Sequence, residues 1–104
     1  MTIYQGDQYA IPITIERNGI TQTANDLQKL EVVLAGINKV YPGEVVYNSG
    51  TQKFLFPLSQ EETLQLEEDS YDILVRPLFN DGSIRGWKKA GNITVIEMEG
   101  ADAL

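Results

Sequence analysis

Acidic side chains crowd one short stretch of the chain and could bind a metal ion. Six carboxylates lie within twelve residues: Glu61, Glu62, Glu67, Glu68, Asp69 and Asp72. Oxygen-rich clusters can hold calcium, but this spacing matches no calcium-binding loop. Glu61 and Glu62 suit the first turn of a helix, where the helix dipole favours negative charge. We therefore interpret the stretch as a solvated surface and predict neither a metal site nor a cofactor.

Most of the residue types that catalysis needs are missing. The chain has no histidine and no cysteine, which removes the most frequent general base, the thiolate nucleophile and the commonest metal ligands. Paired carboxylates could still hydrolyse glycosides across a cleft, but nothing singles out two of the fifteen acids. We predict that the protein is not an enzyme and has no catalytic residue, with a carboxylate-pair hydrolase as a competing hypothesis.

Three aromatic residues are candidates for sugar binding, because flat rings exposed on a β face can stack on pyranose rings. Tyr41 and Tyr47 flank a predicted turn at Pro42-Gly43, and Trp87 lies near the end of a predicted hairpin. Rings in such places also pack into cores or protein interfaces. We therefore name Tyr41, Tyr47 and Trp87 as the residues of a possible glycan site and keep both interpretations open.

The net charge limits the partners. A formal charge of −7 makes electrostatic binding to nucleic acid or to anionic membranes unfavourable, and the only adjacent basic pair is Lys88-Lys89. No apolar run is long enough to cross a membrane as a helix, and the first residues lack the basic head and apolar stretch of a signal peptide. We expect synthesis in a reducing cytoplasm, with neither nucleic acid nor a membrane as a partner.

The pattern of apolar residues predicts strands separated by tight turns. Alternation of apolar and polar residues, or β-rich composition, marks six runs: 9–16, 30–35, 44–47, 51–58, 71–79 and 92–97, with a further hairpin strand at 83–88. Pro12 favours a sheet edge or a bulge for the first run, and Asn18-Gly19 suits a two-residue hairpin turn. Ser59 with Glu62 forms a capping box that predicts a short helix near residues 59–66. Residues 1–104 are therefore predicted to form one all-β domain, an antiparallel two-sheet sandwich of about seven strands.

Several apolar residues fall on the outer phase of these strands, where solvent is expected. They are Val33, Leu55, Leu74 and Leu78, with Ala35 beside them. Apolar residues repeated on an outer face suggest a surface that contacts another chain. We name Val33, Leu55, Leu74 and Leu78 as candidate partner contacts.

The order of strands and turns resembles the small immunoglobulin-like sandwiches of tailed-phage and prophage virion proteins and is similar to the N-terminal domain of phage baseplate upper proteins. The segments that carry the resemblance are Gly6-Asp7, Asn18-Gly19, 30–34, 54–63, 71–76, Asp81-Gly82 and 91–95. It implies an immunoglobulin-like fold and a non-enzymatic structural role in a tail or baseplate, made in the bacterial cytoplasm and located in the virion. It implies other virion proteins as partners, with a homo-oligomer and a host glycan as further options. A carbohydrate-binding or adhesion module is the alternative function.

Overall fold

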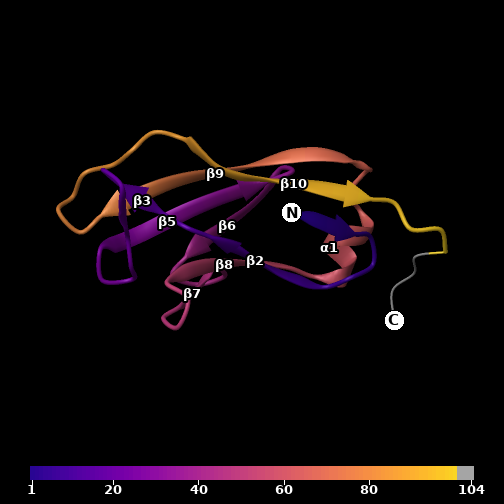
Figure 1. The fold of residues 1–104 in the computed structure, drawn as a ribbon, viewed down its shortest axis with the longest axis horizontal. Coiled ribbons are helices and arrows are strands. Elements are labelled where there is room, and N and C mark those ends of the chain that lie inside the picture. Colours follow the sequence, from indigo (N-terminus) through magenta and orange to yellow (C-terminus); the bar gives the residue numbers. More distant parts are fainter. Residues whose placement is uncertain (101–104) are drawn as a thin grey trace.

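The computed structural model describes residues 1–100 and is mostly β, with 55% of residues in strands and 5% in helix. A five-stranded sheet has the order β1-β10-β9-β5-β6, a three-stranded sheet has the order β2-β8-β7, and β3 and β4 form a small ribbon (Figure 1). The strands are β1 (Thr2–Tyr4), β2 (Tyr9–Ile13), β3 (Glu16–Arg17), β4 (Ile20–Thr21), β5 (Leu27–Leu34), β6 (Ile37–Tyr41), β7 (Val46–Asn48), β8 (Lys53–Leu58), β9 (Asp69–Phe79) and β10 (Lys88–Ile96); the helix is α1 (Gln60–Leu64). The predicted all-β class is confirmed.

One apolar core joins the two larger sheets. Each strand turns alternate residues inward, so that β5 supplies Leu30, Val32 and Leu34 while β8 supplies Phe54, Phe56 and Leu58, all of them fully buried. The alternation predicted for 9–16, 30–35, 51–58 and 71–79 therefore selects the residues that form the core. The faces that carry these side chains are called inner below, and the opposite faces outer.

The chain begins with a strand that the sequence did not predict. β1 pairs in parallel with the end of β10, with Thr2 opposite Thr94 and Tyr4 opposite Ile96, and its central residue Ile3 is fully buried. The prediction of a wholly antiparallel arrangement is therefore wrong at β1. Three residues are too few for a periodic signal, and this strand exists because β10 offers it an edge.

Two tight turns show what turn chemistry can predict. Asn18-Gly19, with φ of 53° and 78°, joins β3 to β4 as expected, because these two residue types tolerate positive φ. Ala35-Gly36, with φ of 50° and 79°, forms an equivalent turn between β5 and β6. The sequence did not predict this turn, because alanine rarely adopts the left-handed conformation, and the placement of Ala35 at the end of a strand was wrong.

The segment after β9 is not a hairpin strand. Residues 83–87 follow β9 through one isolated bridge between Leu78 and Ile84 and a backbone hydrogen bond of 3.2 Å from Arg85 to Pro77. Besides β5, β9 pairs with β10, which starts at Lys88 and includes most of the strand predicted at 92–97. With the short strands β1, β3, β4 and β6 added, the described residues contain ten strands, so the prediction of about seven was too low.

The short helix α1 is confirmed, together with its capping box. The backbone N–H of Glu62 donates a hydrogen bond of 3.1 Å to the Ser59 side chain. The backbone N–H of Ser59 donates one of 2.9 Å to the Glu62 carboxylate. The Lys39 ammonium group, from β6, donates to the same Glu62 carboxylate at 2.8 Å. The cap therefore also ties α1 to the edge of the five-stranded sheet.

This arrangement predicts that stability depends on the ionisation of Glu62. Burial acts to raise its pKa, but the hydrogen bonds from Lys39 and Ser59 outweigh burial and hold the pKa below its ordinary value. A lowered carboxyl pKa stabilises the folded state at neutral pH and loses this effect as the pH falls through the lowered value. Glu62→Gln is therefore expected to cost about 1 kcal/mol at pH 7.

Urea unfolding of both proteins between pH 7 and pH 2 measures this effect. The difference in stability between the native protein and Glu62→Gln should shrink towards the acid end of the range. Glu61→Gln is the control, because Glu61 is exposed and its carboxylate has no hydrogen-bond or ion-pair partner among residues 1–100. A difference that stays constant with pH contradicts the proposed contribution of charge.

Candidate functional site

The acidic residues around α1 are spread over an exposed end of the molecule. Glu61, Glu67, Glu68 and Asp69 are exposed, and within residues 1–100 no group of acidic side chains is placed to hold a metal ion. Asp72 lies apart from them on β9. Hydrogen bonds from Asn92 and then from Lys89 lower its pKa.

The three candidate glycan contacts do not share a site. Tyr41 and Tyr47 are half-buried and lie against Phe54, with ring centroids 5.0 Å and 4.9 Å from the Phe54 ring. Tyr41 pairs with the inward residue Leu30 and therefore belongs to the inner face of the five-stranded sheet. Trp87 is 44% exposed and packs against Arg76, which lies on the outer face. The two tyrosines consequently support the core, and only Trp87 is available at the surface.

The four candidate partner contacts divide between two outer faces, and all are half-buried. Val33 and Leu74 are directly opposite each other on β5 and β9, and Leu78 lies further along β9 on the same outer face. Leu55 belongs to the outer face of the three-stranded sheet, between Pro12 and Val46. The structure therefore brings three of the four residues together and places Leu55 elsewhere.

Residues that the sequence did not single out complete the outer surface along β9. Ile84 is 66% exposed and bridges to Leu78, while the Trp87 ring lies 5.0 Å from the Arg76 guanidinium group. We call Val33, Leu74, Leu78, Ile84 and Trp87 the outer patch. Ile84 and Trp87 join it because residues 83–87 run beside β9 without forming a regular strand, an irregularity that periodicity does not report.

One ion pair crosses the outer patch. Arg76 donates a hydrogen bond of 2.7 Å to Glu31, and this bond is the main cause of the lowered pKa of Glu31. Since the pair is on the surface, its contribution to stability is small. It does hold the Arg76 guanidinium group beside the indole ring of Trp87.

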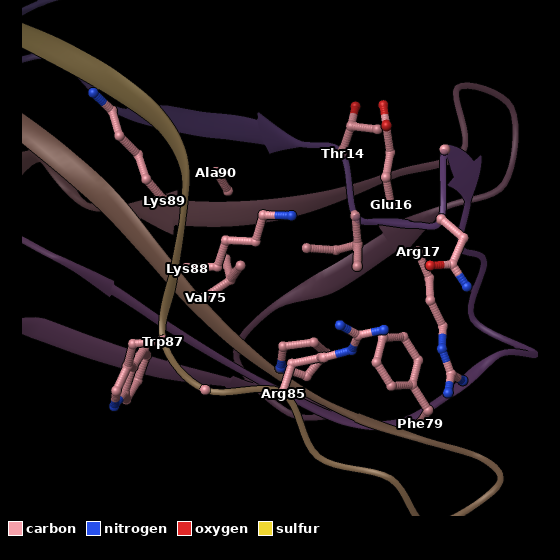
Figure 2. Close-up of a pocket in the computed structure, with 15 residues that line it drawn as sticks. Thr14, Glu16, Arg17, Val75, Phe79, Arg85, Trp87, Lys88, Lys89 and Ala90 are labelled. Carbon is pink, nitrogen blue, oxygen red and sulfur yellow. The ribbon is translucent and has the colours of Figure 1, made fainter.

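A groove with a volume of about 770 Å³ opens beside the outer patch, at one edge of the space between the two larger sheets. Residues 14–19 form one wall, residues 85–90 form the other, and Val75, Pro77 and Phe79 provide an apolar floor. Figure 2 shows Arg85 and Lys88 extending into the space between the walls, whereas Trp87 and Lys89 point away from it.

The end of this groove is held by a network around Asp81. The Asp81 carboxylate accepts hydrogen bonds from the Ser83 hydroxyl at 2.5 Å and the Ser83 backbone at 2.9 Å, and pairs with Arg17 at 3.0 Å. The bonds from Ser83, followed by the Arg17 contact, lower the pKa of Asp81 to about 2. Arg17 also lies 4.3 Å from the centre of the Phe79 ring. The Asp81 network therefore links the wall formed by residues 14–19 to the segment that leads to Ile84.

The groove is positive in an acidic protein. Four of the eight basic residues of the chain belong to its walls, namely Arg17, Arg85, Lys88 and Lys89, of which only Lys89 points away, against a single acidic residue, Glu16 (Figure 2). Arg17 is neutralised by Asp81, and Lys89 by Asp72 at 3.2 Å. The side chains of Arg85 and Lys88 have no partner among residues 1–100. The sequence reveals only the adjacent pair Lys88-Lys89, because Arg17 is distant in the chain.

Comparison with protein-family models, curated proteins and solved structures finds no significant match for this chain. Within residues 1–100, no helix is long and apolar enough to span a membrane.

Proposed function

We propose that this protein is a non-enzymatic structural module of a tailed-phage or prophage particle and acts through protein–protein contacts. The observation that carries the proposal is the outer patch, where Ile84 is 66% exposed beside Leu78 and Trp87 is 44% exposed beside Arg76. Exposed apolar groups that gather on one face favour a protein partner. Tryptophan and arginine are also the residues most often found at the energetic centre of interfaces.

The contacts that hold the residues of the outer patch support this role. Residues 83–87 are held by the Asp81 network and by the backbone bonds to β9, and Arg76 holds the indole of Trp87. A surface that is ordered before binding loses less entropy when a partner docks. The patch is thus better suited to a stable assembly contact than an equally apolar mobile loop.

The placement in a tail or baseplate rests on the resemblance of the strand order, the turns and the helix before β9 to immunoglobulin-like virion domains. The two larger sheets around one core, joined through α1, agree with an immunoglobulin-like sandwich. On this proposal the partners are other virion proteins, including further copies of the same chain.

The alternative, a carbohydrate-binding or adhesion module, now rests on Trp87. Its exposed indole could stack on a sugar ring. Tyr41 and Tyr47 give this alternative little support, because both pack against Phe54. Binding of a glycan that Trp87→Ala removes, without any effect on association between protein chains, favours this alternative over the assembly module.

Association through the outer patch is tested by light scattering over a tenfold range of protein concentration. Association that increases with protein concentration is expected, and Ile84→Glu should raise the dissociation constant at least roughly tenfold, because a carboxylate placed in an apolar contact must lose its hydration. Val46→Glu is the matched control, since Val46 is 55% exposed on β7 of the other sheet. Equal effects of both substitutions, or of neither, contradict docking through this patch.

A further inference from the structure

The groove beside β10 has cations that nothing in the described structure neutralises. Arg85 and Lys88 extend between its walls (Figure 2) and have no side-chain partner among residues 1–100. Their neighbours Arg17 and Lys89 each contact a carboxylate. In a chain with a net charge of −7, two free cations above an apolar floor form a local site for a ligand that combines negative charge with an apolar group.

A segment with this chemistry follows β10. Glu97, Met98 and Glu99 are exposed, Met98 at 45%, and the side chains of both glutamates have no partner among residues 1–100. Two carboxylates therefore flank a flexible apolar side chain, and methionine adapts readily to irregular apolar surfaces. The segment and the groove are complementary in both charge and polarity.

The positions of the groove and the segment favour contact between two molecules. The molecule is elongated, with extents of 48 × 22 × 19 Å. Figure 1 shows β3 and the turn after β9 towards one end of the long axis, and the segment beyond β10 at the other end. Each copy thus presents the acidic segment away from its own groove.

We propose that the groove of one copy binds residues 97–99 of a second copy. Arg85 and Lys88 contact the carboxylates of Glu97 and Glu99, and Met98 packs against the apolar floor. The inference rests on the proposed function and deepens it by naming the partner. Since the two surfaces differ, each pair still has a free groove at one end and a free segment at the other, and further copies can add in the same direction.

The contact is tested by light scattering of the full chain at about 50 mM and about 500 mM salt, because the higher salt screens charge pairs at the surface. The native protein should associate at the lower concentration and dissociate at the higher. Lys88→Glu and the double variant Glu97→Lys/Glu99→Lys should each raise the dissociation constant at least roughly tenfold at low salt.

Controls of equal charge change are available elsewhere on the surface. Lys53→Glu changes an exposed cation of β8, and Glu44→Lys/Glu61→Lys changes two exposed acids outside the segment. Both controls should associate like the native protein. A loss of association as large as that of the groove and segment variants overturns the proposal, because net charge alone then explains the result.

Mixing the two variants gives the sharpest test. Lys88→Glu keeps an intact segment and Glu97→Lys/Glu99→Lys keeps an intact groove, so an equimolar mixture should associate more tightly than either variant alone. A mixture that remains monomeric overturns the head-to-tail contact, and so does a native protein that is monomeric at low salt. Association that survives high salt and is lost only in Ile84→Glu also overturns it, while leaving the proposed function supported by the outer patch.

Discussion

Replacing Phe54 with alanine is expected to lower the free energy of unfolding by about 3–5 kcal/mol, the usual cost of removing a buried phenylalanine. Phe54 is fully buried in β8, where its ring contacts Tyr41 from the five-stranded sheet and Tyr47 from the neighbouring strand β7. The substitution leaves a cavity at the contact between the two sheets, and the backbone of neither sheet can close it without breaking strand pairs.

Urea unfolding, followed by circular dichroism, measures this loss. For a domain of this size it amounts to a large part of the total stability of about 5–15 kcal/mol, and the thermal midpoint should fall by roughly 4–8 °C for each kcal/mol. Val46→Ala is the control at an exposed position of the same sheet, with an expected change within about 0.5 kcal/mol. A loss below about 1 kcal/mol for Phe54→Ala contradicts the packing described here.

Replacing Thr63 with valine is expected to cost about 1–3 kcal/mol, although the two side chains have nearly the same shape. Thr63 is fully buried in α1. Its hydroxyl accepts a hydrogen bond of 3.1 Å from the Gly6 backbone and donates one of 2.8 Å to the carbonyl of Asp7. Valine leaves both backbone groups without these partners, so α1 keeps the bond from Gln60 to the Gly6 carbonyl but loses two others to the loop between β1 and β2.

Thr63→Ser separates the hydrogen bonds from the packing. Serine keeps the hydroxyl and removes one methyl group, which costs about 0.8 kcal/mol. Hydrogen exchange at the Gly6 amide is the direct readout, and it should accelerate in Thr63→Val but stay close to native in Thr63→Ser. Equal exchange in both variants argues against a hydroxyl that anchors this loop.

Local patterns determined much of the secondary structure. Side chains alternate along a strand by geometry alone, so the runs at 9–16, 30–35, 51–58 and 71–79 predicted most of the core residues. The Asn18-Gly19 turn and the capping box at Ser59 also depend only on residues within a few positions. Pro12 correctly predicted a sheet edge, because β2 is the outermost strand of its sheet and proline cannot donate to a second neighbour.

The features that the sequence missed depend on partners distant in the chain. β1 becomes a strand because it lies beside β10, and Ala35 adopts positive φ because the pairing of β5 with β6 requires a two-residue turn. The strand expected at 83–88 was wrong because the register of β9 and β10 leaves most of that segment unpaired. Such pairings are set by the free energy of the whole sheet.

The candidate site shows the same division. The alternation of residues along each predicted strand identified Val33, Leu74 and Leu78 as outward and apolar. It also grouped Leu55 with them, because alternation within one strand does not say which sheet that strand joins. The sequence determined the kinds of residue available for binding: many acids, few cations, no histidine and no cysteine. Only the tertiary structure decided that Arg17, Arg85 and Lys88 line one groove and that Ile84 lies beside Leu78, because strand pairing and packing bring together side chains that are far apart in the chain.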